Sequence, residues 1–114
     1  MIDCIFCRIV AGEIPATRVF EDADTIAFRD IHPAAPTHLL VIPKRHIASL
    51  EDVTGADCGI LGRMLWNAQR AARAEGLADG GYRLVMNVGE NAGQAVPHVH
   101  LHVLGGRPFS WPPG

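Results

Sequence analysis

The feature that most restricts the fold is a run near the end of the chain in which polar and apolar residues alternate. Histidines stand at positions 98, 100 and 102, with Val99, Leu101 and Val103 following them in turn. Successive side chains of a β-strand point to opposite faces of a sheet, so this period of two is typical of a strand. Residues 98–104 are therefore predicted to form a strand with three imidazoles on one face and aliphatic side chains facing the core.

Three imidazoles spaced about 6–7 Å apart along one strand indicate chemistry rather than packing. Imidazole acts near neutral pH as a metal ligand, as a general acid or base, or as a nucleophile. Two interpretations are open from the residues alone: a catalytic zinc ion, or attack of one histidine on phosphorus while a neighbour protonates the leaving group. The glycine-rich stretch at residues 89–94 favours the second, because its backbone N–H groups are suited to phosphate oxygens.

The remaining pattern predicts an α+β fold with an antiparallel sheet of about five strands, one short helix and one long helix. The other strands are expected at residues 17–20, 25–30, 37–43 and 82–88. The short helix is expected at residues 4–10 and the long one at about 56–75. Thr54 and Asp57 resemble a capping box, and Gly12 and Gly76 suit C′ positions. With no repeat or linker, residues 1–114 are expected to form a single domain.

Composition excludes several classes of protein. The net charge is −2 and 48% of residues are apolar, which indicates a folded chain without the basic stripe of a duplex-binding protein. No apolar run reaches the roughly 20 residues of a membrane span, and the first residues do not resemble a secretory signal. Three cysteines do not make a disulfide framework. We therefore expect a reduced cytoplasmic protein that binds neither a nucleic acid polymer nor a membrane.

Cys4 and Cys7 have the spacing of half a zinc site. A site of four cysteines is impossible because only Cys58 remains, so histidines would have to supply the other ligands. The alternative is a pair of ordinary packed cysteines on a short helix.

At these residues the sequence resembles the histidine-triad (HIT) family. The run from His98 to Leu104 matches the signature His-x-His-x-His followed by two apolar residues. Gly105-Gly106-Arg107 and the tail Trp111-Pro-Pro-Gly are similar to the Hint branch, the histidine-triad nucleotide-binding proteins. Further similar segments are residues 5–6, 12–15, 30–31, 36–38, 41–44 and 93–94. The resemblance covers essentially the whole chain.

The resemblance implies a HIT-like fold and a purine nucleoside phosphoramidase that cleaves P–N bonds of AMP-amine substrates. It implies that His100 forms a covalent nucleotidyl intermediate, that His102 sits by the phosphate and leaving group, and that His38 lies behind the nucleophile. The ribose would be held by Asp30. The base would be walled by Ile5, Phe6, Ile9, Ile14, Phe28 and Ile31. Phosphate oxygens would be held by Asn87, Gly93, Gln94 and the backbone of Ala95.

The resemblance further implies a homodimer in which the two sheets continue across a two-fold axis and Trp111 lies near the partner's active site. Some bacterial relatives also carry a structural zinc, whose ligands correspond here to Cys4, Cys7, His46 and His98. No organic cofactor is expected.

One residue departs from the Hint pattern. Ala95 stands where the branch usually has serine, so a hydroxyl that would contact the phosphate or leaving group is missing. Two alternatives are retained: a dinucleoside polyphosphate hydrolase or nucleotidyl transferase on the same fold, and a nucleotide- or zinc-binding interaction module whose catalysis is vestigial.

Overall fold

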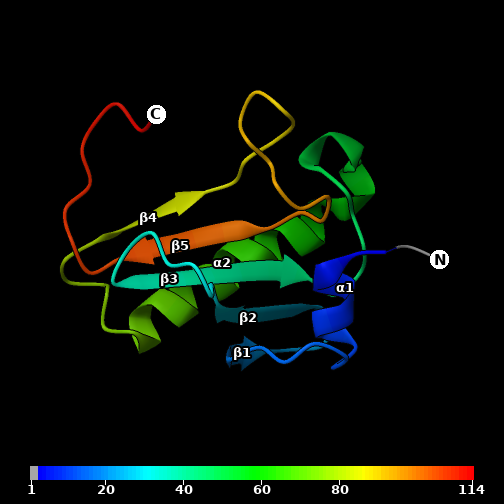
Figure 1. The fold of residues 1–114 in the computed structure, drawn as a ribbon, viewed down its shortest axis with the longest axis horizontal. Coiled ribbons are helices and arrows are strands. Elements are labelled where there is room, and N and C mark those ends of the chain that lie inside the picture. Colours follow the sequence, from blue (N-terminus) through cyan, green and yellow to red (C-terminus); the bar gives the residue numbers. More distant parts are fainter. Residues whose placement is uncertain (1–2) are drawn as a thin grey trace.

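The computed structural model describes residues 3–114, which fold around one antiparallel sheet in the order β1-β2-β3-β5-β4. The strands are β1 (Arg18–Glu21), β2 (Thr25–Arg29), β3 (Thr37–Pro43), β4 (Tyr82–Val85) and β5 (Leu101–Gly105). The long helix α2 (Cys58–Ala74) crosses one face, and the short helix α1 (Ile5–Val10) lies at one end of the sheet (Figure 1). The α+β class and the five antiparallel strands predicted from the sequence are confirmed.

The two faces of the sheet hold separate apolar clusters. On the α2 side, Leu39 and Val41 of β3 and Val103 of β5 pack against buried helix residues such as Met64 and Ala68. On the other side, residues of β2 and β3 pack against α1; they include Ile26, Phe28, Leu40 and Ile42. Strand β3 is buried on both faces, which explains its continuous apolar run. The face toward α1 is the one on which a pocket forms.

The predicted helix signals agree with the structure, with small shifts in the boundaries. Thr54 and Asp57 form the capping box, but the box closes a 3₁₀ turn (Gly55–Asp57) and α2 begins directly after it at Cys58. Gly76 adopts a φ of 77° just after the C-cap of α2, the left-handed conformation that favours glycine. None of the helices within residues 3–114 combines the length and apolar character needed to cross a membrane.

The predicted last strand is wrong at its start, because the ladder begins at Leu101 rather than at residue 98. Val41 faces Leu101, and continuing that register would place Pro43 opposite Val99. Proline has no N–H to donate, so the ladder cannot extend there. Val99 instead donates its N–H to the carbonyl of Ile47 (2.7 Å). The alternation survives without the ladder, since Val99 and Leu101 still lie in the α2 cluster while His98 and His100 do not.

Strand β4 is also shorter than predicted and ends at Val85 rather than residue 88. Its last pairing is Val85 with His102, and the chain then leaves the sheet in the loop between β4 and β5 (Figure 1). Continuing this register would place residues 87 and 88 opposite residues 100 and 99, which lie outside β5.

A buried polar contact joins α2 to the turn between β1 and β2. Asn67 is fully buried and donates through its amide nitrogen to Asp22 (2.8 Å) and to Thr25 (2.5 Å). Burial raises the pKa of Asp22, but hydrogen bonds from Asn67 and from the backbone N–H groups of Asp24 and Thr25 outweigh it and bring that pKa to about 2. The ionised carboxylate therefore stabilises the fold.

Replacing Asn67 tests this contact. We expect Asn67→Ala to lower the free energy of unfolding by about 1–3 kcal/mol near neutral pH, because it removes donors to a charged acceptor. Because the folded pKa of Asp22 is depressed from 3.8 to about 2, the contribution should be complete above about pH 4 and lost as the pH falls toward 2. Urea unfolding at several pH values measures it. Gln69→Ala is the matched control, because it removes an amide side chain from the exposed face of the same helix. Equal losses of stability in both variants would contradict the prediction.

Candidate active site

An apolar pocket of about 340 Å³ opens on the sheet face beside α1. Phe6 and Ile9 of α1 form one wall and Phe28 of β2 lies behind them, with the Phe6 and Phe28 rings edge to face at 5.6 Å. Ile31 stands at the rim with 83% of its surface exposed. Such a slot can bury a flat apolar group while leaving one end open to polar chemistry.

His100 and His102 form the polar end of this pocket, and their rings lie 5.0 Å apart. His100 is buried, and its Nδ1 lies 2.7 Å from the backbone carbonyl of His98. A carbonyl only accepts, so Nδ1 carries the proton and donates it. The lone pair of a neutral His100 ring is then on Nε2, where it is available as a nucleophile.

A second set of hydrogen bonds fixes the proton of His102. The backbone N–H of Ala34 donates to Nδ1 of His38 (3.0 Å), so a neutral His38 carries its proton on Nε2. That Nε2 lies 2.8 Å from Nδ1 of His102 and donates to it. His102 consequently carries its proton on Nε2, and this buried nitrogen has no hydrogen-bond partner within residues 3–114. His102 is thus a neutral donor whose N–H is available to an acceptor on a bound ligand.

The surroundings keep both of these histidines neutral. Burial lowers the pKa of His38, against the opposite effect of the Asp30 carboxylate. Burial also lowers the pKa of His102 to about 4, helped by the neighbouring His100 and His38 and opposed by Asp30. A neutral donor suits the stabilisation of negative charge on a bound oxygen, because it needs no proton transfer to act.

Asp30 has two contacts with the protein. Its Oδ1 accepts from the backbone N–H of His32 (2.8 Å), which closes the turn after β2. Its Oδ2 lies 3.4 Å from Nε2 of His38. The carboxylate also lines the pocket, so it has the remaining acceptor capacity that a sugar hydroxyl requires.

Most residues proposed from the sequence lie around this pocket, but some do not. Those that line it are Ile5, Phe6, Ile9, Ile14, Phe28, Asp30, Ile31, Ala95, His100 and His102. His38 lies behind His102 rather than behind His100. The side chain of Gln94 donates to the backbone carbonyls of Ala48 (2.7 Å) and Val96 (3.0 Å), so it joins its loop to the segment after β3. Asn87 and Gly93 do not line the pocket, and Trp111 is 81% exposed in the C-terminal tail.

Six lining residues are not among the site residues predicted from the sequence: Pro15, Ala16, Arg29, His32, Leu40 and Val96. The sequence predicts a buried strand at residues 37–43 without indicating which face Leu40 occupies. Since His38 and Leu40 share one face of β3, their spacing of two could have placed Leu40 beside the site. Val96 follows an irregular loop, and no periodicity marks its position.

Cys4, Cys7, His46 and His98 lie together next to the pocket, with their ligand atoms all within 4.8 Å of one another. His98 Nδ1 is 3.4 Å from Cys4 Sγ and 3.2 Å from His46 Nδ1, and His46 Nδ1 is 3.3 Å from Cys7 Sγ. Zinc bonds of about 2.3 Å to sulfur and 2.0–2.1 Å to nitrogen give tetrahedral edges of about 3.3–3.8 Å. The four side chains therefore fit a tetrahedral metal ion.

The groups around this cluster also suit a metal site. The other ring nitrogen of His98, Nε2, lies 2.8 Å from the carbonyl of Pro43, which directs Nδ1 toward the cluster. Cys4 is the N-cap of α1, and its sulfur accepts from the N–H of Cys7 (3.4 Å). Burial and the adjacent Cys4 raise the pKa of the Cys7 thiol to about 11. A cation between the two sulfurs would favour their thiolate forms.

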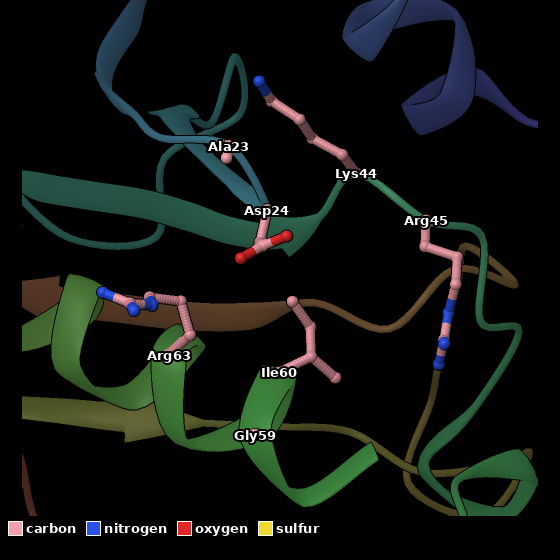
Figure 2. Close-up of a pocket in the computed structure, with 7 residues that line it drawn as sticks. All are labelled: Ala23, Asp24, Lys44, Arg45, Gly59, Ile60 and Arg63. Carbon is pink, nitrogen blue, oxygen red and sulfur yellow. The ribbon is translucent and has the colours of Figure 1, made fainter. Parts of the chain in front are cut away.

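A larger cleft, of about 530 Å³, lies elsewhere, between the first turns of α2 and the β1–β2 turn. Figure 2 shows Lys44, Arg45 and Arg63 around it, with Lys44 and Arg45 pointing in opposite directions. Lys44 pairs with Glu21 (2.7 Å) and Arg45 pairs with Asp57. Because these cations do not converge on one point, we assign the chemistry to the smaller apolar pocket.

The sheet, the pocket and the three alternating histidines define a histidine-triad protein. A family model described as the HIT domain matches residues 11–109, and the chain belongs to this family. An uncharacterised HIT-like protein of Synechocystis sp. is 49% identical over 112 residues, covering 98% of this chain and 97% of that protein.

Solved structures agree. A HIT family hydrolase from Legionella pneumophila superposes with a TM-score of 0.96 at 58% identity, covering 98% of this chain and 100% of that one. A histidine triad protein from Clostridium difficile gives 0.93 at 40% identity, covering 96% of each chain. A histidine triad nucleotide-binding protein from Candida albicans gives 0.81 at 34% identity, covering 96% and 83%.

The hydrogen bonds around His102 predict its titration. We expect His102 to remain neutral down to about pH 4, because burial and its neighbours disfavour the charged ring. In Asp30→Asn the midpoint should fall further, since the carboxylate charge that favours protonation is removed. NMR titration of the ring protons measures both midpoints. A midpoint near that of free histidine in the native protein, or an upward shift in the variant, would contradict the prediction.

Proposed function

We propose that this protein hydrolyses purine nucleoside phosphoramidates by attack of His100 on the α-phosphorus. The observation that carries the proposal is the pairing of proton positions in the pocket: a lone pair on Nε2 of His100 beside an N–H on Nε2 of His102. A nucleophile and a neutral donor 5.0 Å apart between ring centres suit a phosphoryl group held between them. The hydrolase and nucleotide-binding relatives support the same class of reaction.

The reaction would proceed in two halves. In the first, the Nε2 lone pair of His100 forms a bond to phosphorus while the P–N bond breaks, and the nitrogen leaves as the free amine with a proton taken from solvent. In the second, water attacks phosphorus, the bond to His100 breaks and its lone pair is restored. The water supplies the new oxygen, and its proton returns to solvent. His102 would donate to a phosphoryl oxygen in both halves.

The rest of the nucleotide would occupy the apolar part of the pocket. The purine would lie between the α1 wall and the rim at Ile31, where few polar groups discriminate one purine from another. The ribose hydroxyls would be accepted by Asp30. The loop that carries Asn87, Gly93 and Gln94 would move toward the substrate. The backbone N–H groups of residues 93–95 would then also bind phosphate oxygens. Ala95 lines the pocket without a hydroxyl, so His102 is the principal side-chain donor on the leaving-group side.

We further propose that residues 1–114 act as one domain in a homodimer. Strand β4 is an edge of the sheet with a single neighbour, and Leu65 and Trp66 of α2 are 54% and 60% exposed. An unpaired edge and apolar side chains on an exposed helix face suit a second copy of the same surface. The exposed Trp111 does not reach the pocket of its own chain, which is consistent with a role beside the partner's pocket.

The covalent step can be tested directly. Mixing the protein with an adenosine phosphoramidate of lysine and quenching in base should leave a nucleotidyl adduct detectable by intact-protein mass. His100→Ala should remove the adduct and reduce turnover by at least 10³-fold, because the nucleophile is lost. His98→Ala should retain far more turnover, since its backbone carbonyl, which holds the Nδ1 proton of His100, remains.

The same experiment separates the alternatives. Equal and near-complete loss in both folded variants would contradict the assignment of His100. Faster cleavage of a dinucleoside polyphosphate would favour the polyphosphate hydrolase. Nucleotide binding without any turnover would identify a binding module and overturn the proposal of an enzyme.

We also propose that Cys4, Cys7, His46 and His98 hold a structural zinc ion. The donor set and the spacing of its atoms support this proposal. Two thiolates and two imidazoles would fill a tetrahedral ion and leave no position for a reacting water, so the ion would stabilise rather than catalyse. It would join α1 to the segment after β3 and to the segment before β5. A reducing cytoplasmic location, as expected from the sequence, would keep both thiols available.

Metal analysis tests the zinc proposal. Protein purified without chelator should contain about one zinc per chain, lost in Cys4→Ser or Cys7→Ser and retained in Cys58→Ser, which changes an exposed cysteine outside the cluster. Chelation should lower the melting temperature while turnover measured well below it persists. Activity that disappears on chelation and returns with zinc, while the fold persists, would instead make the ion catalytic.

A further inference from the structure

Arg107 lies outside the pocket but contacts the loop that fixes the histidine protons. It follows β5 and donates from Nη2 to the backbone carbonyl of Ala34 (3.0 Å). The N–H of the same residue, Ala34, donates to Nδ1 of His38 (3.0 Å). Ala34, in the β2–β3 loop, is therefore held by Arg107 at its carbonyl and orients His38 through its N–H.

The backbone brings this contact about through a close approach. Gly106 has a φ of 92°, and a Cβ placed there would lie 2.8 Å from Cβ of Pro36. Only glycine lets the end of β5 pass so near the loop. This approach brings the next residue, Arg107, within hydrogen-bond distance of the Ala34 carbonyl.

Arg107 is itself held in position. Its guanidinium lies 4.3 Å from the centre of the Phe109 ring, and its Nη1 donates to the carbonyl of Pro108 (3.1 Å). Arg83 of β4 lies 5.2 Å from the centre of the same ring and donates to the carbonyl of Ser110 (2.9 Å). The two arginines thus make similar contacts with the tail, but only Arg107 also bonds to the loop.

We propose that Arg107 is a positioning residue that, through Ala34 and His38, keeps the proton of His102 on Nε2, the buried nitrogen that has no hydrogen-bond partner within residues 3–114. The series runs from the Arg107 guanidinium to Ala34, from Ala34 N–H to His38, and from His38 Nε2–H to His102 Nδ1. Its consequence for rate rests on the proposed function; its consequence for the His102 proton does not.

Ala34 prevents His38 from carrying its proton on Nδ1. While the Ala34 N–H points at Nδ1 of His38, that nitrogen cannot carry a proton, and the proton of His38 must face His102. Without the restraint, a neutral His38 can also carry its proton on Nδ1, and the Asp30 carboxylate 3.4 Å from Nε2 opposes this move only in part, so both tautomers are populated. Nε2 of His38 then accepts from His102, and His102 presents a lone pair to the pocket instead of an N–H. A lone pair repels the phosphoryl oxygens that an N–H would bind.

The experiment compares three variants. Arg107→Met keeps length and apolar contact with Phe109 but removes the donor. Arg107→Lys keeps a cationic donor, and the Ala34 carbonyl receives one hydrogen bond from residue 107. Arg83→Met is the matched control, since it removes a second cation from beside the Phe109 ring and a bond to the tail without touching the loop.

The first readout is the tautomer of His102 in each full-length protein, followed by ¹⁵N NMR of the imidazole nitrogens at neutral pH. The native protein and Arg83→Met should show His102 protonated at Nε2. Arg107→Met should show a mixture of the two tautomers, and Arg107→Lys should restore the native state. An unchanged His102 tautomer in Arg107→Met would overturn the proposal. Arg107 would then only join the C-terminal tail to the β2–β3 loop.

The second readout is turnover of the phosphoramidate. We expect kcat of Arg107→Met to fall about tenfold, a part of the 10²–10³-fold that loss of one such donor costs, with KM little changed and Arg83→Met close to native. A fall in kcat that Arg107→Lys does not restore would also contradict the proposal. If the native protein turns over no phosphoramidate, the proposed function fails while the tautomer measurement still decides the role of Arg107.

Discussion

Three backbone groups decide what the histidines of this protein can do. The carbonyl of Pro43 accepts from His98, the carbonyl of His98 accepts from His100, and the N–H of Ala34 donates to His38. Each contact settles which ring nitrogen carries a proton. The result is a lone pair on Nδ1 of His98, a lone pair on Nε2 of His100 and an N–H on Nε2 of His102. Chemically identical side chains thus acquire different roles from fixed groups of the main chain. These groups cost little to reorganise during reaction, because the sheet and its loops already hold them.

The segment from His98 to His102 joins two sites that would otherwise be independent. His98 is fully buried and turns toward the two cysteines of α1, while His100 faces the apolar pocket. Their connection is the His98 carbonyl, which belongs to a residue of the cysteine–histidine cluster yet holds the proton of His100. Phe6 contacts both rings, at 5.8 Å from the centre of His98 and 5.2 Å from that of His100. The position of α1 therefore shapes the pocket wall and restrains the segment that carries His98 and His100.

The apolar cluster on the α2 face explains why this arrangement stays rigid. Val99, Leu101 and Val103 pack against α2, so the intervening histidines are directed to the opposite face even where the ladder is interrupted at Pro43. A shift of one residue would exchange buried aliphatic side chains for imidazoles, which the core would not accept. The hydrophobic packing on one face thus maintains the chemistry on the other.

Local sequence patterns determined the fold class, the shared face of the three histidines and the α2 helix with its capping box, because these depend on local periodicity and local hydrogen bonds. The close grouping of Cys4, Cys7, His46 and His98 could be anticipated only through the family resemblance. What the sequence could not determine was the end of the ladder at Pro43, the bond from the Gln94 side chain to the carbonyl of Ala48, and the contact of His38 with His102 rather than His100. Tertiary structure decided these, since each depends on which groups of distant segments come within about 3 Å of each other, and such distances follow from the packing of the whole chain.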